Sequence, residues 1–178
     1  MTTRLIKLGD AIRIARLRNR TKADTDRSRE RYRLKSGGGY SDILMPVTPG
    51  HADAIRNGIV SYEFRKTRPA LPVGRIWLYE TEPVCAVRTV VDVEEILILP
   101  KNDAFHRYGY AAALPKTAFK ADFEDCRDVV VYRLGSQTQI DPATLSDLGL
   151  KCAPRTFFYL TEAGEFSPET QRKDINGS

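Results

Sequence analysis

The sequence predicts a small α+β domain: a largely antiparallel barrel or curled sheet of five or six short strands, with two to three short helices between them. Two observations support this prediction. Short stretches in which apolar and polar residues alternate, or in which β-branched residues dominate, recur between residues 42 and 160, as expected for strands. Turn residues and segments with helical spacing of apolar residues separate these stretches, which is typical of mixed strand and helix folds.

Length and composition limit the class of protein. The 178 residues are 42% hydrophobic, which is enough to build one core with an extension. No apolar run of the length that spans a membrane occurs, and the first residues lack the apolar segment of a signal peptide. The three cysteines are widely spaced and odd in number. We therefore expect a cytoplasmic protein without a disulfide framework.

The positive charge is concentrated at the start of the chain. The first 37 residues contain 12 Lys or Arg and 4 Asp or Glu, a net charge of +8, so the remainder carries −3. The glycine-rich stretch Ser36–Gly39 is the clearest linker. We expect a basic arm and linker over residues 1–39, with an amphipathic helix over 5–20, a folded domain over 40–164 and a polar tail over 165–178. The arm is interpreted either as a contact for nucleic-acid phosphates or as a solvated extension.

The folded domain is expected to begin with a strand and a helix. Asp42–Val47 is an apolar run that predicts a strand, with Pro46 ending it or placing it at a sheet edge. Thr48 is suited to cap a helix whose first position is Pro49. Gly58 predicts the left-handed residue that ends this helix.

The stretch Gly58–Arg68 shows the strictest alternation. Its apolar positions predict one buried face: Val60, Tyr62 and Phe64. Its polar positions predict a face that takes part in recognition: Ser61, Glu63 and Arg65.

Six further elements are expected after this strand. A strand over Arg75–Glu80 alternates between an Ile76/Leu78 face and a Trp77/Tyr79 face, and a turn over Thr81–Pro83 leads into a β-branched strand from Val84. The later elements are a helix starting near Pro115, a strand over Asp128–Leu134, a helical turn capped by Asp141, and a last strand over Thr156–Leu160.

This ordered set resembles the ASCH family of PUA-like β-barrels. The family motif is glycine, any residue, lysine, two of any, glutamate, any and arginine. Gly58, Glu63 and Arg65 match it, and Val60 stands where the lysine is expected. The segment Tyr79–Pro83 resembles the family's aromatic-x-Thr-x-Pro turn, and the resemblance covers about residues 42–162.

The resemblance implies a PUA-like barrel with a cleft beside the motif strand that holds RNA, a modified base or a nucleotide. Some family members resemble RNA-binding modules, and others are amidohydrolases of acetylated cytidine or ribonucleases. In the amidohydrolases the motif lysine takes part in the chemistry. Val60 cannot exchange a proton, so the leading prediction is an RNA-binding or nucleotide-binding module, and the alternative is a hydrolase or ribonuclease.

Several side chains are candidates for the site, each with a structural alternative. Glu63 and Arg65 are two residues apart and form either a structural ion pair or a pair that binds a phosphate or a base edge. Glu63 is the candidate general base, with Lys66 or Lys116 in place of the missing lysine. The predicted binding residues, for which core packing or a solvated turn is the alternative, are Ser61, Glu63, Arg65, Lys66, Arg68, Tyr79, Thr81, Tyr108 and Tyr110.

No metal site or cofactor is expected. His51 and His106 are 55 residues apart, no cysteine pair has zinc-ligand spacing, and no glycine-rich phosphate loop occurs. The segment from His106 to Tyr110 is predicted to be a loop, which either covers the cleft or packs as an ordinary loop. The expected partner is RNA, another single-stranded nucleic acid or a free modified nucleoside, and no membrane.

Overall fold

The computed structural model describes residues 40–160 and 166–167. The predicted basic arm, its helix and most of the predicted tail lie outside these residues. Within them, no helix is long and apolar enough to cross a membrane. The elements in chain order are β1 (Ser41–Val47), α2 (Pro49–Arg56), β2 (Tyr62–Arg65), β3 (Val73–Glu80), β4 (Ala86–Pro100), α3 (Lys101–Tyr108), α4 (Lys116–Asp122), β5 (Asp128–Ala143), β6 (Phe158–Leu160) and β7 (Phe166–Ser167).

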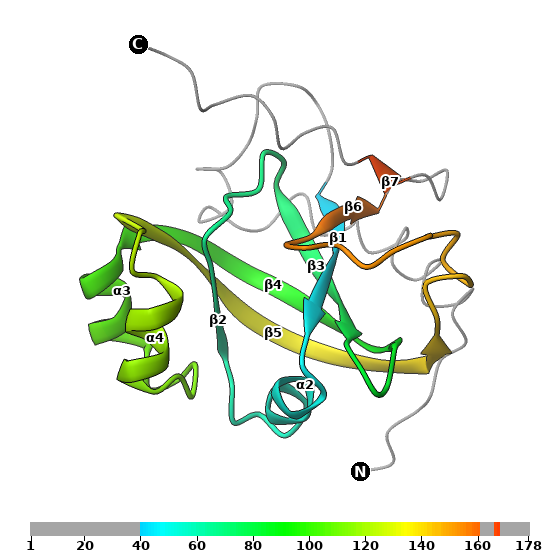
Figure 1. The fold of residues 1–178 in the computed structure, drawn as a ribbon, viewed down its shortest axis with the longest axis horizontal. Helices are drawn as coiled ribbons and strands as arrows, with labels where there is room; N and C mark the ends of the chain where they lie inside the picture. Colours follow the sequence, from blue (N-terminus) through cyan, green and yellow to red (C-terminus); the bar gives the residue numbers. More distant parts are fainter. Residues whose placement is uncertain (1–39, 161–165, 168–178) are drawn as a thin grey trace.

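In the described part of the chain, the strands form one sheet in the order β2-β5-β4-β3-β1-β6-β7. Strand β1 runs parallel to β3, and every other pair is antiparallel. The predicted α+β class with a mostly antiparallel sheet is therefore confirmed. The sheet curls around the long antiparallel pair β4–β5, so that β2 and β1 face each other across a gap, and α2 lies at one end of that gap (Figure 1). No backbone ladder closes the gap in the described residues, so the barrel is open there.

The predicted start and end of the first helix are confirmed. The Thr48 side chain accepts a hydrogen bond from the backbone N–H of His51 at 3.3 Å, and Pro49 occupies the first turn. Gly58 has a φ of 71°, in the left-handed region that glycine adopts without strain. These two ends fix α2 as a helix of 8 residues and place His51 in its first turn.

Strand β1 confirms the predicted strand, but Pro46 does not end it. Pro46 pairs with Tyr79 of β3 on one side. On its other side β6 pairs only with positions 42–44 of β1. The carbonyl of Pro46 is therefore left facing the gap, which agrees with the predicted position at an edge.

Strand β2 is shorter than predicted, and its polar face points inward. Tyr62 and Phe64 pack toward α3 and α4, whereas Val60 precedes the strand and belongs to the main core between β1, β3 and β5. Glu63 is buried opposite Tyr132 of β5. One face of β2 is covered by α3 and α4, and the other faces the inside of the curled sheet, so Glu63 is buried and Arg65 only partly exposed.

Two other predictions about elements are wrong. Strand β5 continues through Asp141 to Ala143, so Asp141 caps no helix. The turn that follows is held by Thr144 and Asp147, whose side chains each accept the other's backbone N–H. The segment expected to be a loop begins inside α3, which ends only at Tyr108.

A buried ion-pair network attaches α2 to the sheet. Glu80 of β3 is completely buried and accepts hydrogen bonds from Arg56 of α2 at 2.6 Å and from Arg88 of β4 at 3.0 Å. Arg56 also donates to the hydroxyl of Thr89 at 3.1 Å. The network therefore holds the end of α2 against β3 and β4 and fixes the orientation of the whole helix.

We expect Glu80→Ala to lower the free energy of unfolding by about 3 kcal/mol, because it leaves two arginines without their buried partner. Arg88→Gln is the control, since it leaves the Glu80–Arg56 pair intact and should cost clearly less. Urea denaturation of the three proteins measures both effects. Equal losses in the two variants would contradict a central role for Glu80.

Candidate functional site

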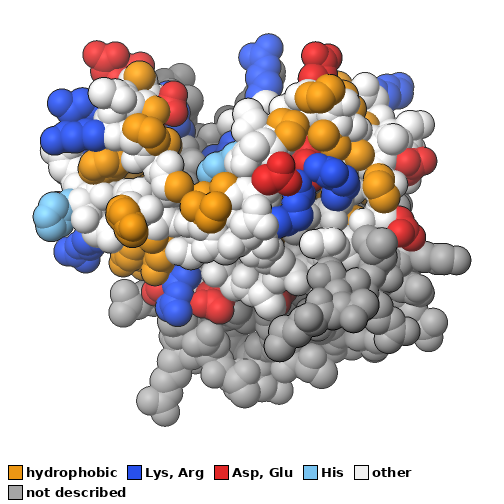
Figure 2. Space-filling view, turned by 90° about the horizontal axis from the view of Figure 1, so that it is seen from below, with side chains coloured by type: hydrophobic (Ala, Val, Ile, Leu, Met, Phe, Trp, Pro, Cys, Tyr) orange, Lys and Arg blue, Asp and Glu red, His pale blue; other side chains and the backbone are white. Residues whose placement is uncertain are grey.

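A cleft lies in the gap between β2 and β1. It has a volume of about 680 Å³ and opens between the α3–α4 side of the molecule and the α2–β1 side (Figure 2). Its polar lining comes from α2 and its cap, from β2 and the residues after it, from the end of α4 and from the segment before β6: Thr48, His51, Tyr62, Glu63, Arg65, Lys66, Thr67, Asp122 and Thr156. Apolar side chains complete its walls, among them Phe64 of β2, Phe123 directly after α4 and Phe157 directly before β6.

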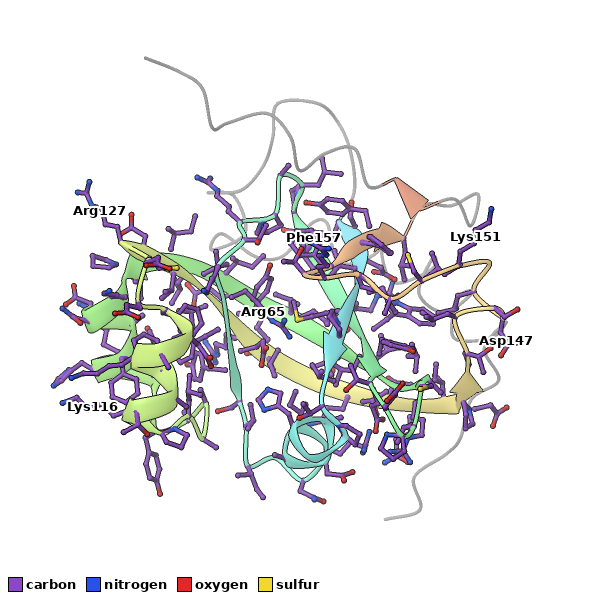
Figure 3. The ribbon with its side chains drawn as sticks, viewed as in Figure 1. Arg65, Lys116, Arg127, Asp147, Lys151 and Phe157 are labelled. Carbon is purple, nitrogen blue, oxygen red and sulfur yellow. The ribbon has the colours of Figure 1, made fainter. Side chains whose placement is uncertain are left out.

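Arg65 spans the cleft from one wall to the other. Its Nε donates to Glu63 Oε1 at 2.8 Å within β2, and its Nη2 donates to the carbonyl oxygen of Pro46 on β1 at 2.9 Å. Figure 3 shows Arg65 between the two strands, with Phe157 at one end of the gap. The Arg65 guanidinium thus connects β2 to β1, which are not joined by backbone hydrogen bonds.

Glu63 and His51 form a second contact inside the cleft. His51 Nε2 lies 2.6 Å from Glu63 Oε2, and Glu63 Oε1 is already occupied by Arg65. The Glu63 side chain is 9% exposed, whereas the His51 side chain is 33% exposed. Because the carboxylate can only accept, Nε2 carries the proton and the other ring nitrogen, Nδ1, is left without a partner among the described residues. Glu63 therefore orients His51 and Arg65, and these two face the ligand space.

The contacts among His51, Glu63 and Arg65 favour the protonated form of His51 and the ionised form of Glu63. The hydrogen bond to Glu63 raises the pKa of His51, although burial opposes the rise. Burial alone would raise the pKa of Glu63, but the hydrogen bond from His51 and the charge of Arg65 outweigh it and hold the pKa below its usual value. Glu63 is thus a carboxylate, paired with an imidazole that titrates above its ordinary range.

Tyr132 of β5 belongs to the main core beside Glu63 and does not line the cleft. It pairs with Glu63 in the β2–β5 ladder, is fully buried, and its hydroxyl has no hydrogen-bond partner within the described chain. Burial raises the pKa of Tyr132, so its hydroxyl stays neutral.

The cleft contains only some of the residues predicted for it. Glu63, Arg65 and Lys66 line it, and Lys66 is exposed at its mouth. Glu63 and Arg65 form an ion pair, and both side chains also line the cleft. Their role in binding a phosphate or a base edge stays a prediction.

The other predicted residues do not line the cleft. Tyr79 packs with Trp77 and Leu44 in a separate core cluster on the opposite face of the sheet. Tyr108 stacks on Tyr62 with ring centroids 4.5 Å apart. The residues outside the cleft lining are Ser61, Arg68, Tyr79, Thr81, Tyr108 and Tyr110, and Lys116 also lies outside it.

His51 is the cleft residue that the sequence did not single out for this role. The cap formed by Thr48 predicts its position in the first turn of α2, but nothing local predicts its distance to Glu63. No group of three or more His, Cys, Asp or Glu able to hold a metal ion occurs in residues 40–160 and 166–167.

Comparisons with known proteins identify similar chains. No family model matches the sequence. A protein of Zymomonas mobilis named "ASCH domain-containing ribonuclease" is 31% identical over 109 residues, which is 60% of this chain and 73% of that protein.

Solved structures of an ASCH protein from Zymomonas mobilis have the same fold. The first has a TM-score of 0.64 at 26% sequence identity and covers 69% of this chain and 90% of that chain. Structures of its serine-to-alanine and tyrosine-to-phenylalanine variants give the same TM-score at 28% and 27% identity.

The His51–Glu63 contact predicts a measurable proton affinity. We expect nuclear magnetic resonance titration of the His51 ring to give a pKa above 6.5, and the Glu63→Gln variant to return it to 6.5 or below, because burial and the charge of Arg65, which both lower the pKa, then remain. His106→Gln removes the other histidine signal and serves as the assignment control. Since the folded-state pKa is raised, the contact stabilises the fold below pH 6.5 and loses that effect as the pH rises through the raised value. An unchanged pKa in Glu63→Gln would contradict the assigned cause.

Proposed function

The chain belongs to the ASCH domain family, and from this premise we propose that it binds single-stranded RNA in the cleft between β2 and β1. The observation that carries the proposal is the combination of Arg65, His51 and exposed Lys66 in one cleft of about 680 Å³. A cleft of this size accommodates a ligand of nucleotide dimensions. The name of the Zymomonas mobilis relative supports RNA as the polymer.

The charge balance of the cleft suits a base with a neighbouring phosphate. Arg65 and Lys66 are matched by Glu63 and Asp122, so the lining becomes net positive only when His51 is protonated. A bare phosphate gains little from a balanced site. A base edge, by contrast, meets the guanidinium of Arg65, the Nδ1 acceptor of His51 and apolar walls, while Lys66 at the mouth takes the phosphate.

The basic arm of residues 1–39 belongs to the same proposal. Its surplus of Lys and Arg would add phosphate contacts that do not depend on sequence. The domain of residues 40–164 would then supply the preference for a base.

We expect Lys66→Gln to weaken binding of a labelled single-stranded RNA by about fourfold at 0.15 M salt and to reduce the salt dependence, because one phosphate contact is lost. Arg65→Ala should weaken binding further. Fluorescence anisotropy at two salt concentrations, with DNA of the same sequence alongside, measures both effects.

Lys151→Gln is the matched control, since Lys151 is an exposed lysine that does not line the cleft and lies at the opposite edge of the molecule from α3 and α4 (Figure 3). Thermal unfolding shows whether Arg65→Ala remains folded. Absence of binding to both polymers would overturn the proposal and point to a free modified nucleoside as the ligand.

The His51–Glu63 pair favours a second function, cleavage of RNA. A carboxylate that fixes the proton on Nε2 leaves Nδ1 as an acceptor in the cleft, which is the arrangement of an oriented general base. In this role His51, and not Glu63, takes the proton of a 2′-hydroxyl while that oxygen attacks the adjacent phosphorus. The bond from phosphorus to the 5′-oxygen breaks, the leaving oxygen takes a proton from water, and the products are a 2′,3′-cyclic phosphate and a 5′-hydroxyl.

We expect His51→Gln to abolish cleavage of a labelled RNA while binding persists within about threefold, because general-base catalysis contributes at least about 100-fold to rate. Glu63→Gln should reduce cleavage and shift its pH profile toward lower pH, since the pKa of His51 falls. DNA, which has no 2′-hydroxyl, is the control substrate. Products with a 5′-phosphate would contradict this mechanism, and wild-type protein that binds but does not cleave would leave binding as the sole function.

A further inference from the structure

A second hollow lies between α3 and α4, outside the cleft. Its volume is about 980 Å³, and its lining includes Phe105, Tyr110, Lys116 and Lys120. Leu114, Ala121 and Phe123 line both this α3–α4 groove and the cleft, so the two hollows adjoin along a shared wall. A chain that leaves the cleft over this wall enters the groove.

The floor of the α3–α4 groove is a rigid aromatic layer. The rings of Phe105 and Phe119 lie 4.8 Å apart, and those of Phe119 and Phe123 lie 4.9 Å apart and stacked. Phe119 and Phe123 are buried, and Phe105 is partly exposed. The layer therefore supports the two helices and holds the groove open without needing a ligand.

Tyr110 stands at this groove as a fully exposed aromatic ring. It follows the end of α3, and none of the ring contacts or side-chain hydrogen bonds within the described chain involves it. A ring that contributes no packing is free to take a flat partner on its face. Stacking of a nucleobase on such a ring is tolerant of sequence.

The charge of the groove favours an anionic polymer. Lys101, Lys116 and Lys120 line it against one carboxylate, Glu124. The Lys101 amine is held by the carbonyls of Phe123 and Glu124, whereas Lys116 and Lys120 are exposed and form no ion pair within residues 40–160. Figure 2 shows Lys and Arg side chains beside hydrophobic ones over α3 and α4.

We propose that the α3–α4 groove is a second nucleotide subsite, which binds the part of a single-stranded RNA that extends beyond the cleft. Tyr110 stacks on a base, and Lys116 and Lys120 contact phosphates. This inference rests on the proposed function, since the cleft supplies the first contact and the shared wall supplies the path.

The test compares oligouridylates of 4 and 12 nucleotides on the full chain. Tyr110→Ala should weaken binding of the 12-mer by about fivefold or more, and Lys116→Gln by about fourfold at 0.15 M salt. Both should leave the 4-mer, which the cleft holds alone, unchanged. Tyr110→Phe should bind as the wild type does, because stacking needs the ring and not the hydroxyl. Lys151→Gln is the charge-matched control at a distant surface.

The outcomes separate this inference from the proposed function. If Lys66→Gln weakens both lengths while Tyr110→Ala and Lys116→Gln weaken neither, the groove is no subsite and the cleft proposal stands. If the wild type binds neither length, both fall. If a labelled oligoglutamate peptide binds in a Lys116-dependent way and the 12-mer does not depend on Lys116, the groove serves an acidic peptide and the RNA subsite is overturned.

Discussion

The side chain of Arg65 is the connection on which the site depends. The curled sheet leaves β2 and β1 unpaired, and the Arg65 guanidinium joins them by contacting Glu63 on one strand and the Pro46 carbonyl on the other. A side chain that replaces a backbone ladder keeps the two walls together while leaving space between them. The gap is therefore an open cleft and not a pair of hydrogen-bonded strands. Its polar side chains are already oriented before a ligand enters.

The second constraint is the attachment of α2. This short helix carries His51 at its start and Arg56 at its end, and the buried Glu80 holds Arg56 against β3 and β4. Because the helix is fixed at its far end and capped by Thr48 at its near end, the imidazole has little freedom to leave Glu63. The Glu80–Arg56 ion pair, which lies outside the cleft lining, thus helps to fix the position of the His51 imidazole inside the cleft.

The residues at the family motif positions have a structural role here, whereas the sequence predicts that Glu63 acts on the ligand. Glu63 is buried with both oxygens engaged, so it acts on other side chains and not on a ligand. Val60, at the position of the motif lysine, is part of the core. The exchangeable proton in this chain is carried by His51, which comes from α2, so the cleft retains a titratable group although the motif position has lost one.

The sequence alone determined the class of fold, the ends of α2, the alternation of β3 and the placement of Glu63 and Arg65 on one face of β2, since all of these follow from local spacing and alternation along the chain. The tertiary structure alone decided that β2 buries its polar face, that His51 meets Glu63, and that Tyr110 lies at a separate groove while Tyr79 is in the core. The physical reason is that backbone periodicity fixes which face a side chain occupies along its own strand or helix. The curl of the sheet and the packing of α3 and α4 decide what that face meets.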